Sequence, residues 1–467
     1  MTLTTLIKGG LVVTAADETE ADVLVEDGRI AAVVARDSTA AASLTADRTL
    51  DATDRYVIPG GVDAHTHMDF PFGGTFSSDD FETGTRAAAW GGTTTIVDFA
   101  VQTKGHALRE GLDRWHAKAD GRCAVDYAFH MILSDVNEGT LKEMDALVEE
   151  GVTSFKMFMA YPGVFYSDDG QILRAMQRTA ANGGLTMMHA ENGIAIDVLV
   201  EQALAAGRSD PRHHGEVRKA LLEAEATHRA IQLARVAGSP LYVVHVSASE
   251  AVEQLAAARG MDLPVFGETC PQYLYLSTDN LAEPDFGGAK YVCSTPLRPR
   301  EHQAALWRAL RTDDLQVVST DHCPFCFTGQ KELGRGDFSK IPNGMPGVEH
   351  RMDLLHQAVV DGHLTRRRWI DLACTTPARM FGLHPKKGTL APGADADIVI
   401  YDPRAEQTLS AETHHMNVDY SAYEGKRLTG RVETVLSRGE PVVERGSYSG
   451  RAGHGRYVPR GICQLLN

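Results

Sequence analysis

The chain has 467 residues, enough for about three ordinary domains or for one large barrel with a small domain beside it. Hydrophobic residues make up 43% of the chain and charged residues 23%, which excludes a disordered or low-complexity protein. Lysine and arginine total 46 against 62 aspartate and glutamate residues, so the formal net charge of −16 argues against nucleic acid or a membrane surface as the partner.

The sequence carries no signal for a membrane or for secretion. No apolar run approaches the roughly 18 residues of a membrane span, and residues 1–20 lack the basic start and apolar run of a signal peptide. We therefore expect a cytoplasmic enzyme. The seven cysteines are odd in number and scattered, so we expect reduced thiols; the single C-x-x-C of Cys323 and Cys326 lacks the second pair of a zinc ribbon.

Both ends of the chain are rich in short β-type segments. Asp27-Gly28 is a strong hairpin signal between two of them. The segments are Leu6 to Thr14, Asp22 to Val25, Ile30 to Val34, Ala396 to Tyr401 and Gly430 to Leu436. We expect the two ends to meet in one small β-sandwich domain built from residues 1–55 and 386–445, followed by a C-terminal tail over 446–467.

The middle of the chain, residues 56–385, alternates short apolar runs with longer helical stretches, which is typical of βα units with parallel strands. Eight runs over about 265 residues fit an α/β fold, the (β/α)8 TIM barrel of ~250 residues, with a doubly wound open sheet as the alternative. The expected strands are Tyr56 to His67, Thr94 to Phe99, Val125 to Ile132, Ser154 to Phe158, Leu185 to His189, Leu241 to Val246, Val265 to Thr269 and Val317 to Asp321. Helices are expected at Leu141 to Glu150, Glu216 to Ala237 and Ser249 to Ala258.

Polar side chains gather where these strands end. The active site of such a barrel lies at the carboxyl ends of its strands. Five of the eight strands bring a group of interest there: His65 and His67, Lys156, His189, His245 and Asp321. A single buried histidine is ordinarily satisfied by a backbone carbonyl, but four histidines and an aspartate at strand ends indicate a metal site.

The spacing of His65 and His67 supports this interpretation. Side chains alternate along a strand, so residues two apart point the same way and both imidazoles can face the barrel axis.

Lys156 is the unexpected member of this group. Phe155, Met157 and Phe158 surround it in sequence, and an unpaired buried ammonium is costly. A neutral amine that adds carbon dioxide becomes a carbamate, a two-oxygen anion able to bridge two metal ions. The plain alternative is an ammonium paired with Asp126 or Asp98.

Five segments carry these groups: Gly60 to His67, Ser154 to Phe158, Met188 to Asn192, Val244 to Ser247 and Thr320 to Phe325. In this order they resemble the amidohydrolase superfamily and, more narrowly, its cyclic-imide branch, dihydropyrimidinase and D-hydantoinase. The resemblance continues through Glu225 to Ala230, Pro377 to Arg379 and Gly393 to Asp397, so it covers nearly the whole chain.

The resemblance implies a centre of two divalent metal ions, Zn²⁺. It assigns His65, His67 and Asp321 to the more buried ion and His189 and His245 to the other, with carbamylated Lys156 and a hydroxide between them. Paired ions of this kind lower the pKa of water toward ~7.

The resemblance also implies how a small cyclic imide or ureide substrate is held. Tyr161 donates a hydrogen bond to the carbonyl that becomes an oxyanion, while Ser294 and Asn343 bind the imide ring. The family commonly has two prolines after the serine, whereas here Thr295 replaces the first. Asp321 accepts a proton from the attacking water and passes it to the departing ring nitrogen. From the residues alone, the alternative is that Tyr161 is a packed loop aromatic.

Phe72, Phe158 and Phe165 lie on segments that line the pocket for the ring substituent in hydantoinases. They could equally be ordinary core residues. If they line the pocket, the substituent is apolar or modest in size, because those segments supply no charged partner.

Three other functions compete with hydrolysis of dihydropyrimidines or 5-substituted hydantoins to N-carbamoyl amino acids. Dihydroorotase typically has an arginine two residues after the second histidine that holds the substrate carboxylate, whereas this chain has Asp69, which would repel that carboxylate. Allantoinase acts on a substituted hydantoin with a polar tail and is harder to exclude. Non-enzymatic relatives of dihydropyrimidinase lack the full ligand set that is present here. The resemblance also implies a homotetramer, in which the tail after Arg445 could be exchanged between subunits.

Overall fold

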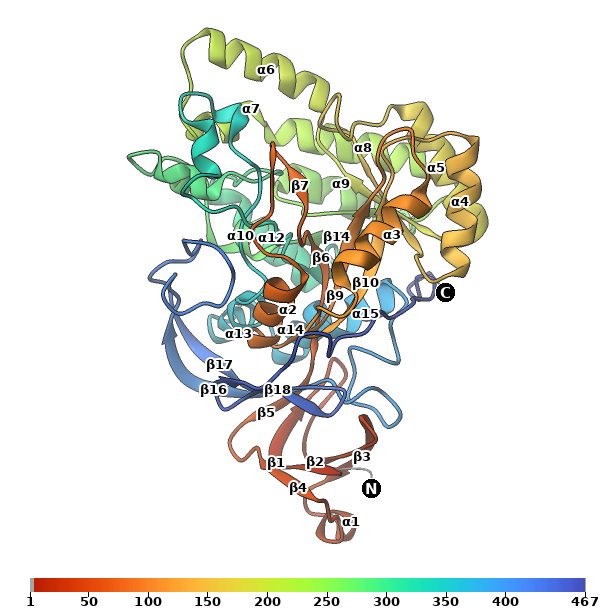
Figure 1. Ribbon diagram of the computed structural model, residues 1–467, viewed down its shortest axis with the longest axis vertical. Coiled ribbons are helices and arrows are strands. Elements are labelled where there is room, and N and C mark those ends of the chain that lie inside the picture. Colours follow the sequence, from red (N-terminus) through yellow and green to blue (C-terminus); the bar gives the residue numbers. More distant parts are fainter. Residues whose placement is uncertain (1–3, 467) are drawn as a thin grey trace.

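Residues 4–466 are described by the computed structural model, and their central part is a barrel of eight parallel strands, each hydrogen-bonded to the next in chain order (Figure 1). This confirms the expected (β/α)8 arrangement. The barrel strands are β6 (Gly61–Thr66), β9 (Thr93–Val101), β10 (Asp126–Ile132), β11 (Ser154–Phe158), β12 (Leu185–His189), β13 (Leu241–Val243), β14 (Val265–Thr269) and β15 (Val317–Val318).

The last strand segment returns to the first. A parallel bridge joins Thr66 to His322, and the His67 N–H donates to the His322 carbonyl over 2.8 Å. An open sheet would leave two separate edges, so the open-sheet alternative is wrong.

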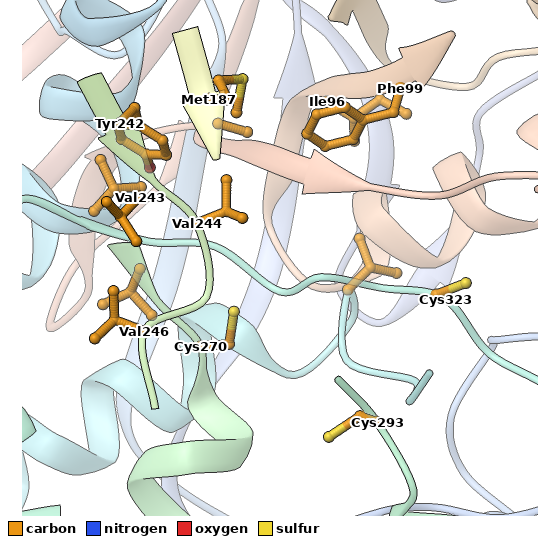
Figure 2. Close-up of a cluster of buried hydrophobic side chains, with 14 of the residues drawn as sticks. Ile96, Phe99, Met187, Tyr242, Val243, Val244, Val246, Cys270, Cys293 and Cys323 are labelled. Atoms are coloured by element: carbon orange, nitrogen blue, oxygen red, sulfur yellow. The ribbon is translucent and has the colours of Figure 1, made fainter. Parts of the chain in front are cut away.

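The barrel strands are buried on both faces. Every residue of β9, β10, β11 and β12 is buried, as expected for parallel strands covered on both sides. Figure 2 shows part of the resulting core, with Ile96 and Phe99 from β9 and with Tyr242, Val243 and Val244 from β13 and the chain just after it.

The helices alternate with the strands and also build the loops at the barrel mouth. A helix was expected over residues 216–237, but the observed helix begins at Ala220. Arg218 is not helical and separates this helix from the short one before it. The α-helices after β6 are α2 (Phe81–Trp90), α3 (Leu108–Ala119), α4 (Glu138–Glu149), α5 (Asp169–Asn182), α6 (Gly193–Ala205), α7 (Arg212–Val217), α8 (Ala220–Ala237), α9 (Ser249–Arg259), α10 (Pro271–Tyr275), α11 (Thr278–Leu281), α12 (Glu301–Thr312), α13 (Arg351–Val360), α14 (Arg366–Ile370) and α15 (Thr376–Met380). Shorter turns are η1 (Gly287–Tyr291), η2 (Lys331–Gly334), η3 (Phe338–Lys340) and η4 (Asp371–Thr375).

A second, nine-stranded sheet joins the two ends of the chain, and its red and blue strands lie together below the barrel in Figure 1. The expected hairpin is present, with positive φ at Asp27 (53°) and Gly28 (72°) as a two-residue turn requires. Its strands are β1 (Thr5–Val13), β2 (Glu18–Glu26), β3 (Arg29–Ala35), β4 (Arg48–Asp51), β5 (Tyr56–Pro59), β16 (Ile398–Thr408), β17 (Arg427–Ser437), β18 (Glu440–Glu444) and β19 (Ser447–Tyr448). Two small additions are α1 (Thr39–Ala42) and the hairpin of β7 (Pro71–Phe72) and β8 (Thr75–Phe76).

The expected first barrel strand, Tyr56 to His67, is in fact two strands. β5 pairs with β1 and β16 in the smaller sheet, and only β6 enters the barrel. The chain crosses between the sheets at Gly60, where a Cβ atom would lie 2.1 Å from Thr94 Oγ1. Pro59, Gly60 and Gly61 interrupt the expected strand at this point, and this breaker signal marks the change of sheet. The division into segments 1–55, 56–385, 386–445 and 446–467 otherwise stays a proposal.

The C-terminal segment packs on the barrel of its own chain. The Tyr127 N–H of β10 donates to the Arg456 carbonyl over 3.0 Å, and the Val458 N–H donates to the Tyr127 carbonyl over 2.8 Å. Arg460 is buried and donates to Ser154 Oγ over 2.8 Å. Among the helices of residues 4–466, none has the length and apolar character needed to cross a bilayer.

A buried ionic cluster joins the barrel to the smaller sheet. Lys387 Nζ lies 2.5 Å from Asp126 at the start of β10, 2.9 Å from Asp395 and 2.7 Å from Asp397 beside β16. The carboxylates outweigh the effect of burial and raise the pKa of Lys387, so its charge is retained.

Lys387→Met should therefore destabilise the fold by about 3–5 kcal/mol, because it leaves the buried carboxylates of Asp395 and Asp397 without their cation. Thermal unfolding of the variant and of Lys386→Met, which removes the exposed neighbouring lysine, measures the effect. We expect a midpoint several degrees lower for Lys387→Met alone. Equal midpoints for the two variants would contradict the role of the cluster.

Candidate functional site

Two histidines and an aspartate meet at the barrel mouth. His65 and His67 come from the end of β6, and their Nε2 atoms are 3.2 Å apart. Asp321 Oδ1, from the segment after β15, lies 3.1 Å from His65 Nε2 and 3.2 Å from His67 Nε2. All three side chains are buried, so the barrel presents two imidazoles and a carboxylate to one point.

Glu268 on β14 orients His65 from behind. Its Oε1 accepts the hydrogen bond of His65 Nδ1 and that of the His245 backbone N–H, while Tyr242 and Ser319 donate to its Oε2 over 2.8 and 2.6 Å. With its proton on Nδ1, a neutral His65 directs the lone pair of Nε2 at the mouth.

The charges around the site favour a cation. Burial and Lys156 lower the pKa of His65, but Glu268 and Asp321 outweigh them and raise it. Burial raises the pKa of Asp321, but the neighbouring histidines outweigh it and hold that pKa well below the ordinary value. Burial lowers the pKa of His67 to about 4. The three groups therefore combine a carboxylate with imidazoles and attract one positive charge, either a proton or a metal ion.

A second pair of histidines lies beside the first. His189 Nδ1, at the end of β12, is 2.9 Å from His245 Nε2, and the rings of His65 and His245 are 5.5 Å apart between centroids. Glu191 lies 2.8 Å from His189 Nε2 and accepts from Arg218 over 2.8 Å. Burial lowers the pKa of both His189 and His245, so both are neutral and can offer a lone pair.

Lys156 on β11 completes the group. Its Nζ lies 3.3 Å from His65 Nε2 and faces the rings of Phe99 and Phe158 at 4.6 and 5.1 Å. The expected alternative partners are engaged elsewhere: Asp98 accepts from Thr66, Met68 and Trp115, and Asp126 binds Lys387 and Arg438. Pairing of Lys156 with either is therefore wrong. Burial lowers the pKa of Lys156 to about 8, which raises the fraction of neutral, nucleophilic amine.

The donor set fits divalent metal ions. The structure brings together all six residues predicted as ligands, and the ligand atoms of His65, His67 and Asp321 all lie within 4.8 Å of one another. Ring nitrogens and carboxylate oxygens that face one another at about 3 Å repel through their lone pairs unless a hydrogen or a metal ion lies between them. Imidazole and carboxylate ligands in a buried pocket are those that Zn²⁺ accepts. Asp126, Asp395 and Asp397 are also grouped within 4.8 Å, but Lys387 already lies among them.

The residues expected to bind the substrate ring lie on the rim of the same pocket. Asn343 Nδ2 donates to Ser294 Oγ over 3.0 Å and approaches the Tyr161 hydroxyl at 3.5 Å. Burial raises the pKa of Tyr161 to about 12, so its hydroxyl keeps the proton that it could donate. Thr295, where relatives commonly have proline, donates to the His245 carbonyl over 3.0 Å.

The three phenylalanines line this pocket. Phe165 stacks on Phe158 at 5.1 Å and on Phe72 at 6.4 Å between ring centroids, and Phe72 meets Tyr161 edge-on at 5.2 Å. Beyond Phe72, Tyr161 and Asn343 the pocket opens into an outer cavity of about 990 Å³. The site is thus an apolar passage that ends at the histidine cluster.

The expected effect of Asp69 on a carboxylate substrate is not supported. Asp69 Oδ2 lies 3.1 Å from Lys118 Nζ, so its charge is paired on the outer side of the loop. The absence of an arginine at this position remains the relevant difference from dihydroorotase.

Several residues of the site were not predicted. Glu268, Glu191 and Arg218 orient the histidines, and Phe70 joins the aromatic wall. A carboxylate on the strand Val265 to Thr269, where apolar residues are expected, was a signal for Glu268. Arg218 carries no such signal, because it reaches the site from a long connection between strands.

Comparisons with known proteins agree with this geometry. The Amidohydrolase family matches residues 56–442. A D-hydantoinase from Streptomyces coelicolor is 79% identical over 466 residues, 100% of both chains, and one from Geobacillus stearothermophilus is 51% identical over 98% of this chain and 97% of its own. Among solved structures, a dihydropyrimidinase from Brevibacillus agri superposes with a TM-score of 0.97 at 48% identity, over 98% of this chain and 99% of that one.

Glu268→Gln should weaken binding of divalent metal about 10–100-fold. The NH₂ group of the glutamine would face either His65 or the hydroxyls of Tyr242 and Ser319, all of which donate hydrogen bonds to Glu268, and His65 would lose its fixed orientation. Competition with a chelator measures the affinity independently of activity. Glu253→Gln, an exposed change on α9, is the control. Equal affinities in the two variants would show that Glu268 does not orient a metal ligand.

Proposed function

This chain belongs to the amidohydrolase family, and on that premise we propose that its six converging side chains hold two divalent metal ions, Zn²⁺, with Lys156 carbamylated. The chain is a cyclic amidohydrolase that opens the cyclic amide bond of hydantoins or dihydropyrimidines. The observation that carries the proposal is the meeting of four imidazoles, a carboxylate and a buried amine in one pocket, at separations of 2.9 to 3.3 Å.

The ligand set divides into two groups. His65, His67 and Asp321 form one group, His189 and His245 form the other, and Lys156 lies beside His65. Carbon dioxide adds to the neutral Lys156 amine: the N–C bond forms, one N–H proton leaves to water, and a carbamate anion results. Two ions held by these residues would polarise the substrate carbonyl and lower the pKa of a water molecule.

The chain's own residues then guide the reaction. Tyr161 donates its hydroxyl hydrogen to the carbonyl oxygen, where negative charge develops. Ser294 and Asn343 hold the edge of the ring, joined to each other by their 3.0 Å hydrogen bond. Asp321 accepts a proton from the attacking water and returns it to the departing ring nitrogen. Water has then added across one C–N bond, and the product is an N-carbamoyl amino acid.

The pocket wall supports a preference among substrates. Phe72, Phe158 and Phe165 form an apolar surface next to the cluster, suited to an aryl or alkyl group at position 5 of a hydantoin. A polar ureido tail, as in allantoin, would lose its hydration there. Because the relatives at 79% and 51% identity are named D-hydantoinases, we propose that the D-enantiomer is the one opened. The homotetramer and the cytoplasmic location stay predictions.

Lys156→Ala should reduce the metal content from two ions per chain to one or fewer, because the carbamate that links them is lost. Elemental analysis of undialysed protein checks this, with Lys142→Ala on α4 as an exposed control. Millimolar acetate or propionate should restore part of the metal and of the activity by replacing the carbamate. Full metal content in the variant would contradict the proposed ligand set.

Tyr161→Phe should lower kcat about 10²–10³-fold and raise KM much less, because its hydrogen bond strengthens in the transition state. Steady-state kinetics with D-5-phenylhydantoin and with dihydrouracil measure both constants, and elemental analysis should show the metal unchanged. An unaltered kcat would remove Tyr161 from this role.

A further inference from the structure

Lys331 is fully buried at the start of η2, and its ammonium meets three backbone carbonyls. The oxygens of Val292, Pro342 and Gly344 lie 2.9, 2.7 and 2.8 Å from Nζ. An ammonium has three N–H donors, so this arrangement satisfies it completely. The aromatic ring of Phe325 covers the group at 5.7 Å.

These carbonyls belong to the two segments that carry the ring-binding side chains. Val292 lies two residues before Ser294, and Pro342 and Gly344 flank Asn343. The Gly344 N–H also donates to the Val292 carbonyl over 3.0 Å. One side chain therefore joins two segments that are about fifty residues apart in sequence. These are the segments that carry Ser294 and Asn343, the two partners of the hydrogen bond described above.

The position of Gly344 is fixed from the opposite side as well. A Cβ atom there would lie 2.2 Å from the Cys323 carbonyl oxygen, and the Cys323 N–H donates to the Met345 carbonyl over 3.1 Å. Figure 2 shows Cys293 and Cys323 on neighbouring stretches of chain in this region. The Asn343 segment is thus held between the Cys323 loop and Lys331.

We propose that Lys331 is a positioning residue: its ammonium sets the spacing of the Ser294 and Asn343 segments, so that the two side chains present one preformed edge to the substrate ring. The inference rests on the proposed function, which assigns these two residues to ring binding. Lys331 suits this role because its one side chain donates to carbonyls of both segments. Without it, the Pro342 and Gly344 carbonyls would lose this donor and the Val292 carbonyl would keep the Gly344 N–H.

Lys331→Met, made in the full chain loaded with metal, removes the three donors and keeps the length of the side chain. We expect KM for D-5-phenylhydantoin to rise about tenfold, the effect of losing one hydrogen bond to the substrate. The value of kcat should fall less than threefold, and the variant should keep two metal ions per chain. KM does not depend on the folded fraction, so partial unfolding does not mimic this result. Lys387→Met, which removes another buried lysine away from the pocket, should keep the original KM.

A double-mutant cycle separates positioning from general damage. If Lys331 acts through the ring-binding side chains, adding Lys331→Met to Asn343→Ala should change KM less than twofold. A full tenfold effect in that background, or an unchanged KM in the single variant, overturns the inference. Lys331→Gln keeps two N–H donors and should raise KM by a smaller factor; it takes the place of Lys331→Met if that variant does not fold.

The same cycle distinguishes failure of the proposed function. If Asn343→Ala and Ser294→Ala both keep the original KM, these residues do not bind the ring, and the inference falls together with that part of the proposal. If they raise KM while the Lys331 variants do not, only the inference falls.

Discussion

Lone pairs that face one another at the mouth of the barrel are the constraint on which the site depends. His65, His67 and Asp321 converge within 3.2 Å, and His189 and His245 within 2.9 Å, all of them buried. Glu268 and Glu191 hold the far nitrogens of His65 and His189, so that each directs its other nitrogen inward. Atoms this close repel through their lone pairs unless a proton or a metal ion lies between them, and the arrangement therefore suits a metal centre.

The barrel supplies the rigidity that this convergence needs. His245, Asp321 and Tyr161 adopt positive φ angles of 41°, 52° and 61°, which non-glycine residues rarely adopt. The three lie just after strands, where the hydrogen-bonded barrel fixes the chain on one side and long loops fix it on the other. The same principle extends outward, since Lys331 collects carbonyls from two loops beside the ring-binding residues.

Much of this organisation was predictable from the residues, and the exceptions have physical reasons. The strands ending in His189 and holding Lys156 were predicted with their observed bounds, because apolar residues predominate in parallel strands covered on both faces. The division between β5 and β6 was missed although Pro59, Gly60 and Gly61 mark it, because the apolar residues on either side do not say which sheet each strand joins. The six groups were visible because ionisable side chains are uncommon in and just after strands that are otherwise apolar. Arg218 and Lys331 were not, because only the folded loops bring them to the pocket.

Lys156 links the structure to the proposed chemistry, because its buried amine lies beside His65 and must be modified to hold a cation. A crystal structure of freshly prepared, catalytically active protein that has never met a chelator tests this most directly. It should show carbamate density on Lys156 Nζ and two metal ions, identified by anomalous scattering, between the histidines. An unmodified amine and no bound ions in fully active protein would contradict the account.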